Sequence, residues 1–311
     1  MAITAAMVKE LREMTGAGMM DCKKALNETN GNMDEAVEFL RKNGQAKAEK
    51  KASRIAAEGL CTVVMKDDKT AAVVEVNSET DFVAKNATFQ EFVKAVATQA
   101  VNSDAADMDA FMAEKWNEDA SKTVSEALVE KVAVIGENLK IRRFEKVVAE
   151  HGCVVPYVHG GGRIGVIVDA DTDVVNDTVK EAMHNIAMQI AALNPKYVSR
   201  DEVSADYIAH EKEILLAQIM NDPKESQKPE KVINGMIEGR ISKELKEVCL
   251  VDQVYVKAED GKQTVAKYLE EVSKAVGGTV KVKRFVRFET GEGLEKKQED
   301  FAAEVAAQMN A

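Results

Sequence analysis

The spacing of apolar residues changes several times along the chain, and each change predicts a different kind of element. From the N-terminus the apolar positions recur every three to four residues, which is the spacing of amphipathic helices. Gly16 and Gly31 divide this stretch into three helices, and Asn32 caps the third, which we expect to stop at Gly44. Together with an Ala- and Lys-rich connector, these helices predict an N-terminal module over residues 1–54.

Beyond the connector the apolar period changes to two. Residues 61–65 and 71–76 alternate around a polar turn and predict a β-hairpin, which helices and a strand over 139–148 follow. The same order recurs later in the chain as a second hairpin, a helix and a closing strand, at 153–168, about 177–193 and 280–288.

The two closing strands also share a pattern. A lysine, an apolar residue, a basic residue and an Arg-Phe pair follow one another at 140–144 and again at 281–285. A repeated order of elements that carries a repeated pattern indicates an internal duplication. We therefore expect two related α+β core subdomains, the first over 55–150 and the second over 151–196 with 251–291.

Residues 197–250 interrupt the second subdomain with two helical stretches on either side of Pro223 and Pro229. They predict an inserted antiparallel helical hairpin, whose apolar residues exceed a single seam, so we expect this arm to pack on something else. Residues 292–311 begin with a glycine-rich turn and end in a helix that Asp300 caps. The predicted fold class is α+β: a three-helix N-terminal module, two core subdomains, the inserted hairpin and a C-terminal helix.

Length and charge narrow the choice of function. A chain of 311 residues exceeds one ordinary core. The net charge of −11 argues against nucleic acid and anionic membranes as ligands, because phosphate groups are bound by basic surfaces. The four cysteines form no C-x-x-C pair and the four histidines show no ligand spacing, so we expect reduced thiols and no metal site. Without a signal peptide or an apolar run of roughly 18 residues, we expect a cytoplasmic protein.

A glycine-rich run, Gly160-Gly161-Gly162-Arg163-Ile164-Gly165, formally fits the dinucleotide fingerprint G-x-G-x-x-G. In a dinucleotide site this loop enters a helix, whereas here it enters a predicted strand, so we expect no cofactor. There is no phosphate loop of the G-x-x-x-x-G-K-[ST] type, and no nucleophile and base stand at the spacing of a triad. We therefore predict no catalytic residues and no enzyme, and we expect His159 to be a turn residue hydrogen-bonded to backbone.

Residues 78–86 follow a predicted strand and open a helix. Asn77 and Ser78 are suitable N-caps, and Asp81 lies in the first turn, where the helix dipole favours an acidic side chain. Phe82 follows this carboxylate directly. On local physics alone we expect Phe82 to be buried in the core, since most phenylalanines are buried.

Five separated segments resemble the bacterial elongation factor Ts family, and the resemblance extends over essentially the whole chain. The segments are 11–26, 80–86, 135–138, 159–165, and 288–293 with the terminal helix. The first follows the opening motif of the family nearly residue for residue, with Met14 in place of a usual charged residue. The resemblance implies a nucleotide exchange factor that binds the GDP form of the GTPase elongation factor Tu and promotes GDP release.

The resemblance also implies which residues would act. Thr80, Asp81, Phe82 and Val83 would disturb the magnesium and phosphate site of the GTPase. Other contacts to it would be Met19, Met20, Lys23, His159, Gly160, Val256 and Phe301. Gln253-Val254-Tyr255-Val256 departs from a family pattern that has Pro and Phe at the middle positions. The inserted arm is the dimerisation element of the family, which implies that this chain can form a homodimer.

A second hypothesis concerns the N-terminal module alone. Residues 3–44 resemble the ubiquitin-associated fold, a small binding domain, so the chain could be an adaptor or chaperone that holds peptides on a Met-rich face. This hypothesis leaves the duplicated core and residues 78–86 unexplained. A third hypothesis, an oxidoreductase that uses the glycine run, predicts nucleotide binding by the isolated chain.

Overall fold

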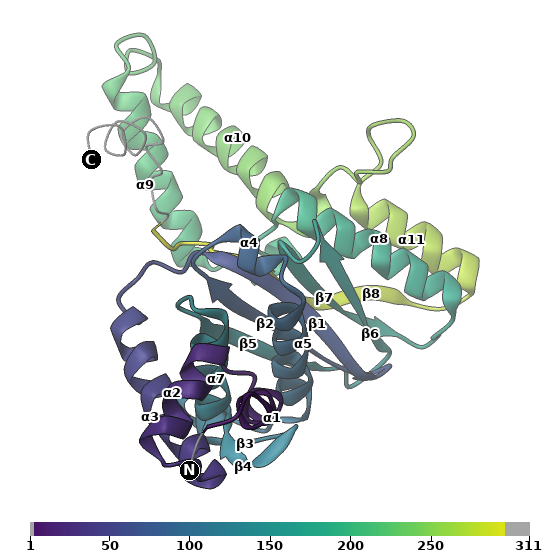
Figure 1. Ribbon diagram of the computed structural model, residues 1–311. Coiled ribbons are helices and arrows are strands. Elements are labelled where there is room, and N and C mark those ends of the chain that lie inside the picture. The colour runs from purple at the N-terminus through teal and green to yellow at the C-terminus, as the bar shows by residue number, and fades with distance from the viewer. Residues whose placement is uncertain (1–2, 296–311) are drawn as a thin grey trace.

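Two antiparallel three-stranded sheets pack face to face at the centre of the computed structural model, which describes residues 3–295 (Figure 1). The first sheet has the order β1-β2-β5, with strands Glu58–Asp67, Thr70–Ser78 and Lys140–Val148. The second has the order β6-β7-β8, with strands Cys153–His159, Ile164–Thr172 and Val280–Glu289. Helices lie against the outer faces of both sheets, so the predicted α+β class is confirmed.

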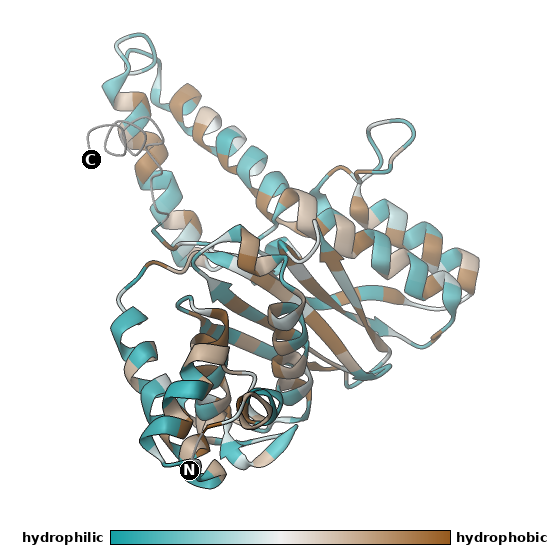
Figure 2. Ribbon diagram, in the orientation of Figure 1, coloured by the Kyte–Doolittle hydropathy of each residue, from teal (hydrophilic) through white to brown (hydrophobic). Residues whose placement is uncertain are grey.

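The central strands β2 and β7 are buried on both faces, because helices pack on one face of each sheet and the other sheet packs on the opposite face. Successive side chains of a strand point to opposite faces and therefore pack in different layers. Val73 of β2 packs in the layer between the sheets, together with Ile167 of β7. The next residue, Val74, instead packs with the residues of α5 (Ala87–Asn102) on the outer face. The result is a four-layer arrangement of helices, sheet, sheet and helices, in which the apolar positions concentrate on the strands and on α5 (Figure 2).

The outer helices differ between the two sheets. The first sheet is covered by α5 and by a group of smaller elements: α6 (Met108–Ala113), β3 (Lys115–Trp116), β4 (Asp119–Thr123) and α7 (Val124–Ile135). The second is covered by α8 (Asp177–Leu193) and α11 (Val265–Val276). Helix α8 has the bounds that the sequence predicts, whereas α6, α11 and the short β3–β4 pair were not predicted.

The N-terminal module consists of α1 (Ala5–Thr15), α2 (Met19–Glu28) and α3 (Met33–Lys51), packed around Leu11, Leu26 and Ala36. The expectation that the third helix stops at Gly44 is wrong. Gly44 is buried inside α3, where an added Cβ would lie 3.4 Å from the Cβ of Ala133 in α7. The glycine thus allows α3 to pack closely on α7, and the good helix formers that follow extend α3 to Lys51.

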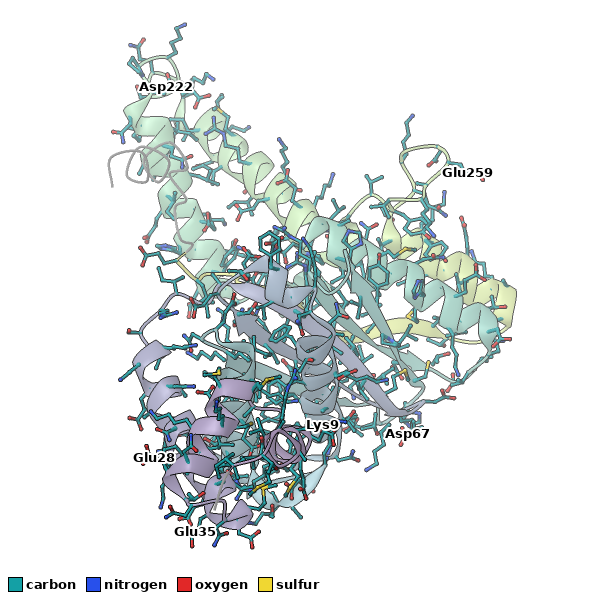
Figure 3. All side chains as sticks on the ribbon, viewed as in Figure 1. Lys9, Glu28, Glu35, Asp67, Asp222 and Glu259 are labelled. Atoms are coloured by element: carbon teal, nitrogen blue, oxygen red, sulfur yellow. The ribbon has the colours of Figure 1, made fainter. Side chains whose placement is uncertain are left out.

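The inserted arm consists of α9 (Ala205–Asn221) and α10 (Glu230–Val248), flanked by the 3₁₀ turns Arg200–Glu202 and Leu250–Asp252. It projects away from the sheets, and Asp222 lies at its outer end (Figures 1 and 3). Its two helices meet along a buried apolar seam: Ile219, Ile233, Ile237, Ile241 and Leu245. Four other large apolar side chains of the arm stay exposed: Ile214, Leu216, Met220 and Val232. The predicted C-terminal helix lies outside the described residues.

The two halves of the core contact each other reciprocally. The N–H of Cys61 in β1 donates to the carbonyl of Gly162 in the β6–β7 turn, at 2.6 Å. The N–H of Val154 in β6 donates to the carbonyl of Asp68 in the β1–β2 turn, at 2.9 Å. Each half therefore places its turn against the first strand of the other half. We call the two resulting ends of the sandwich the glycine end and the Asp68 end.

Candidate functional site

A single helical turn, α4 (Asp81–Ala84), leaves the glycine end of the sandwich between β2 and α5 (Figure 1). Thr80 is its N-cap: the backbone of Thr80 is extended, and its hydroxyl accepts a hydrogen bond from the N–H of Val83. Asn86 then caps α5 through the N–H of Phe89. The two caps confine the protruding segment to residues 79–86, which we call the tip.

The expected caps Asn77 and Ser78 are wrong, because both residues are still part of β2 and are buried there. The Asn77 amide donates to the carbonyl of Glu58 at 3.1 Å and to Glu75 at 3.0 Å. The Ser78 hydroxyl donates to the carbonyl of Thr80 at 3.0 Å. These bonds hold the end of the strand against the base of the tip, so the helical turn begins later than the pattern predicts.

Phe82 is 79% exposed, so the local expectation that it is buried is wrong. A phenylalanine exposed to this degree on a capped turn is rare, because burying an aromatic ring is strongly favourable. Asp81 and Lys85 form an ion pair across the turn at 2.7 Å, and Lys85 lowers the pKa of Asp81 below its ordinary value. Lys85 also lies 5.9 Å from the centre of the Phe82 ring. The tip thus presents an aromatic ring beside a carboxylate.

The glycine turn (residues 159–163) lies next to the tip. A cleft of about 260 Å³ separates the two segments, lined by Asp81 and Lys85 on one side and by Gly160 and Gly161 on the other. The sequence places these residues far apart, and the folded chain brings them together. Val256 is not among the residues that line this cleft.

Packing accounts for two glycines of the fingerprint-like run. At Gly162, where φ is +103°, an added Cβ would lie 2.5 Å from Cδ2 of Leu60. At Gly165 an added Cβ would lie 3.0 Å from Cγ2 of Val73 and 3.2 Å from Cβ of Cys61, in the layer between the sheets. The run enters strand β7 and no helix, as the sequence predicts. These glycines therefore allow the two sheets to approach closely.

His159 is exposed at the start of the glycine turn. Its carbonyl accepts the N–H of Arg163 at 3.0 Å, which closes the turn, and its Nδ1 lies 2.8 Å from the hydroxyl of Tyr157. The Tyr157 ring packs edge-on against His184 of α8. His159 is thus exposed at the end of the edge strand β6, and its imidazole contacts the Tyr157 side chain.

Val256 lies on the loop between the arm and α11 and is 47% exposed. Its N–H donates to Oε1 of Gln189 at 2.7 Å, and the Gln189 amide donates to Gln253 and to the carbonyl of Val254, both at 3.0 Å. Tyr255 points inward and stacks on Tyr268. Gln189 therefore shapes this loop. The signal in the sequence was a glutamine on the face of α8 that is otherwise apolar.

The remaining predicted contact residues lie elsewhere. Met19, Met20 and Lys23 are all exposed on α2, with the two methionines 59% and 74% exposed. Helix α2 lies away from α4 in the view of Figure 1. Phe301 lies outside the described residues. The structure therefore distributes the predicted contact residues over at least three separate surfaces.

A buried carboxylate connects the glycine end to the turn that follows β8. Glu75 is fully buried, and its oxygens accept hydrogen bonds from the N–H of Gly291 at 2.8 Å, from Arg142 at 3.0 Å and from Arg143 at 2.6 Å. Burial raises the pKa of Glu75, but the donors from Gly291, Asn77 and Arg142 outweigh it and hold the pKa below its ordinary value. Arg143 also packs on the ring of Phe288.

Within residues 3–295, no cluster of three or more His, Cys, Asp or Glu side chains is arranged to hold a metal ion. In the same part of the chain, no helix combines the length and apolar content that crossing a membrane requires.

Comparison of the sequence with known proteins shows which family the chain resembles. A family model described as Elongation factor TS matches residues 79–292, from the tip to the turn after β8. The chain is 54% identical to elongation factor Ts of Clostridioides difficile strain 630 over 308 residues, and 52% identical to that of Clostridium novyi strain NT over 309 residues. Each alignment covers 99% of both chains. The chain therefore belongs to the elongation factor Ts family.

Proposed function

We propose that this protein is a guanine nucleotide exchange factor that binds the GDP form of elongation factor Tu and promotes release of GDP. The observation that carries the proposal is the exposed Phe82 on a turn that two caps and the adjoining β2 strand hold in place. Such a ring is free to enter a partner, and the turn that bears it needs little reorganisation on binding.

In a GTPase, magnesium bridges the nucleotide phosphates and protein side chains, so a displaced ligand weakens a large electrostatic interaction. In the proposed complex Phe82 and Asp81 press on the partner near its magnesium, while Thr80 and Val83 shape the turn. A factor that binds the nucleotide-free GTPase more tightly than the GDP form must weaken GDP binding by the same ratio. Only a binding surface is needed for this effect, and no covalent step is involved.

The other predicted contact residues supply affinity in this proposal. Met19, Met20 and Lys23 on α2 form one contact, and adaptable methionines suit such a surface. His159 and Gly160 form a second contact beside the tip, Val256 a third, and Phe301 a fourth. Because the α2 contact lies away from α4, which bears Phe82 (Figure 1), binding of the nucleotide-free GTPase and displacement of GDP can be affected separately.

The direct test is release of fluorescent GDP from elongation factor Tu, followed with increasing concentrations of this protein. We expect a release rate that rises and then saturates, while the isolated chain binds neither GDP nor GTP in calorimetry. Unaccelerated release, with recovery of many different peptides in a pull-down, would favour the adaptor hypothesis. Micromolar nucleotide binding by the isolated chain would favour the oxidoreductase hypothesis.

We also propose that the arm forms a homodimer contact. Ile214, Leu216, Met220 and Val232 are exposed outside the seam that joins α9 and α10. Leu216→Glu should shift the mass measured by light scattering from dimer to monomer, whereas Gln218→Glu on the same helix adds equal charge and should leave it unchanged. A monomer in the unsubstituted protein would contradict this proposal.

A further inference from the structure

The carboxylate of Glu137 lies directly beneath the tip. Its Oε2 accepts the backbone N–H groups of Glu79 at 3.0 Å and Thr80 at 3.1 Å, and its Oε1 accepts the hydroxyl of Thr80 at 2.7 Å. The same hydroxyl is the N-cap of α4, because it accepts the N–H of Val83. Glu137 therefore binds the two residues that precede Asp81 and orients the group that starts the helical turn.

Glu137 itself is held in a fixed position. It follows Gly136, which ends α7 in a left-handed conformation with φ at +88° and donates its N–H to the carbonyl of Val132. The next residue, Asn138, donates its N–H to Glu79 at 2.6 Å and its amide to the carbonyl of Arg54 at 2.8 Å. The base of the tip is thus tied to the end of α7 and to the segment that follows α3.

A single helical turn with one threonine cap would fluctuate if its first residues were not bound, because an isolated turn of helix is unstable. The charged acceptor under Glu79 and Thr80 restricts the direction in which Asp81 and Phe82 point.

We propose that Glu137 is a positioning residue for exchange: its carboxylate sets the orientation of the tip and touches neither the partner nor the nucleotide. This inference rests on the proposed function. It predicts that Glu137 governs how fast GDP leaves the complex, and that it has little influence on how tightly the complex forms, because the α2 surface and the His159 contact are unchanged.

Three substitutions separate the possible roles of the side chain. Glu137→Ala removes all three acceptor contacts. Glu137→Asp keeps the charge but is one methylene too short to reach both backbone N–H groups. Glu137→Gln keeps the length: its carbonyl can accept the N–H groups of Glu79 and Thr80, and its amide can donate to the Thr80 hydroxyl. The matched control is Glu126→Ala, which removes a carboxylate that accepts the Thr123 N–H at 2.7 Å at the opposite end of α7.

The experiment measures GDP release from elongation factor Tu over a range of factor concentrations, and hydrogen exchange of the amides in residues 78–83. For Glu137→Ala and Glu137→Asp we expect the maximal release rate to fall between about tenfold and a hundredfold, since misplacing a group that acts in the rate-limiting complex by about 1 Å can have effects of this size. The half-saturating concentration should change less than about threefold, by our estimate for contacts that are left intact. Amides of Glu79 and Thr80 should exchange faster, and Glu137→Gln should restore most of the rate.

Glu126→Ala should lower the thermal midpoint without changing the maximal release rate. The inference is wrong if Glu137→Ala releases GDP at the unsubstituted rate, if Glu137→Gln is as slow as Glu137→Ala, or if Glu126→Ala slows release equally. If the unsubstituted protein does not accelerate release at all, the proposed function fails, and the hydrogen-exchange result still decides whether Glu137 orders the tip.

Discussion

The two ends of the sandwich are built alike but carry different surfaces. At each end a central strand leads toward a helix that an asparagine caps: Asn86 for α5 at the glycine end and Asn176 for α8 at the Asp68 end. At the Asp68 end the chain passes from Thr172 to Asn176 through a short loop. At the glycine end the corresponding stretch contains an additional helical turn, α4, with Phe82 on it. The two ends therefore share the same connection from strand to capped helix, and only the glycine end has an added turn that carries an exposed ring.

The buried acids of the two central strands show the same difference. Glu75 in β2 faces Arg143 across a shift in strand register, and Asp169 in β7 faces Arg284 across an equivalent shift. Glu75 also accepts hydrogen bonds from Asn77, Arg142 and the N–H of Gly291. Asp169 is paired with Arg284 at 3.2 Å, and its Oδ1 has no hydrogen-bond partner among the described residues. The end that carries Phe82 is therefore braced more strongly than the other.

The largest effect expected from this comparison is on stability. Glu75→Ala leaves Arg142 and Arg143 without their buried acceptor and should lower the free energy of unfolding by about 3–5 kcal/mol. Asp169→Ala should cost less, about 1–3 kcal/mol, because Arg284 is 45% exposed and can be rehydrated. Urea unfolding of both variants measures the difference. Equal losses would mean that the two acids are equivalent.

The second effect separates the two ends by function. Phe82→Ala should lower the maximal GDP release rate by about tenfold or more, which corresponds to at least roughly 1.4 kcal/mol. Unfolding stability should change by less than about 1 kcal/mol, as at ordinary surface positions. Val175→Ala, at an exposed apolar residue of the Asp68 end, is the matched control and should alter neither quantity. Loss of stability by Phe82→Ala with unimpaired release would make Phe82 structural.

A smaller effect depends on pH. Because the pKa of Glu75 is lowered in the folded protein, its ionised form contributes stability above the unfolded pKa of about 4.3, and this contribution is lost as pH falls through the folded pKa. The difference in unfolding free energy between the unsubstituted protein and Glu75→Gln should therefore be largest near pH 7 and should decrease steadily below about pH 4. A difference that stays constant between about pH 7 and pH 3 would contradict the role assigned to the charge.

The smallest effect concerns the Asp68 end. Lys180 of α8 pairs with both carboxylate oxygens of Asp68 at 2.9 Å, but the two side chains are 39% and 63% exposed. Lys180→Ala should lower the thermal midpoint little or not at all, with less effect in high salt, and should leave GDP release unchanged. Thermal unfolding at two salt concentrations, with release assays on the same protein, tests both statements. Slower release would mean that this end also contacts the partner.

The sequence predicts what depends on local periodicity. Helix α8 has the predicted bounds, and the strands of both sheets lie where alternation indicates. The expectations that were wrong depend on tertiary contacts. Gly44 remains helical because α3 packs on Ala133, and Thr80 replaces Asn77 as a cap because β2 continues through Ser78 to complete its ladder with β1. Helix α11 is an exception, because its apolar positions Val265, Leu269 and Val272 have helical spacing but we predicted no helix there.

In the candidate site, too, local patterns predict some features, whereas others depend on tertiary contacts. The segment that contains the tip could be located from sequence. The local pattern gave no reason to leave the Phe82 ring in water, and only the family resemblance implied that this ring is presented to a partner. The proximity of Asp81 to Gly160 follows from the packing of two sheets, and no spacing in the chain encodes it. The hydrogen bonds of Glu137 likewise join residues that are distant in sequence, so only the folded chain indicates them.

The position of Cys61 in the layer between the sheets determines the chemistry of its thiol. Cys61 is fully buried between the sheets, and burial raises its pKa to about 12. Because alkylating reagents and disulfides react with the thiolate, this cysteine is inert while the sandwich stays closed. Any modification of Cys61 therefore counts only molecules whose sheets have separated. The rate at which Cys61 is labelled therefore reports how often the core opens.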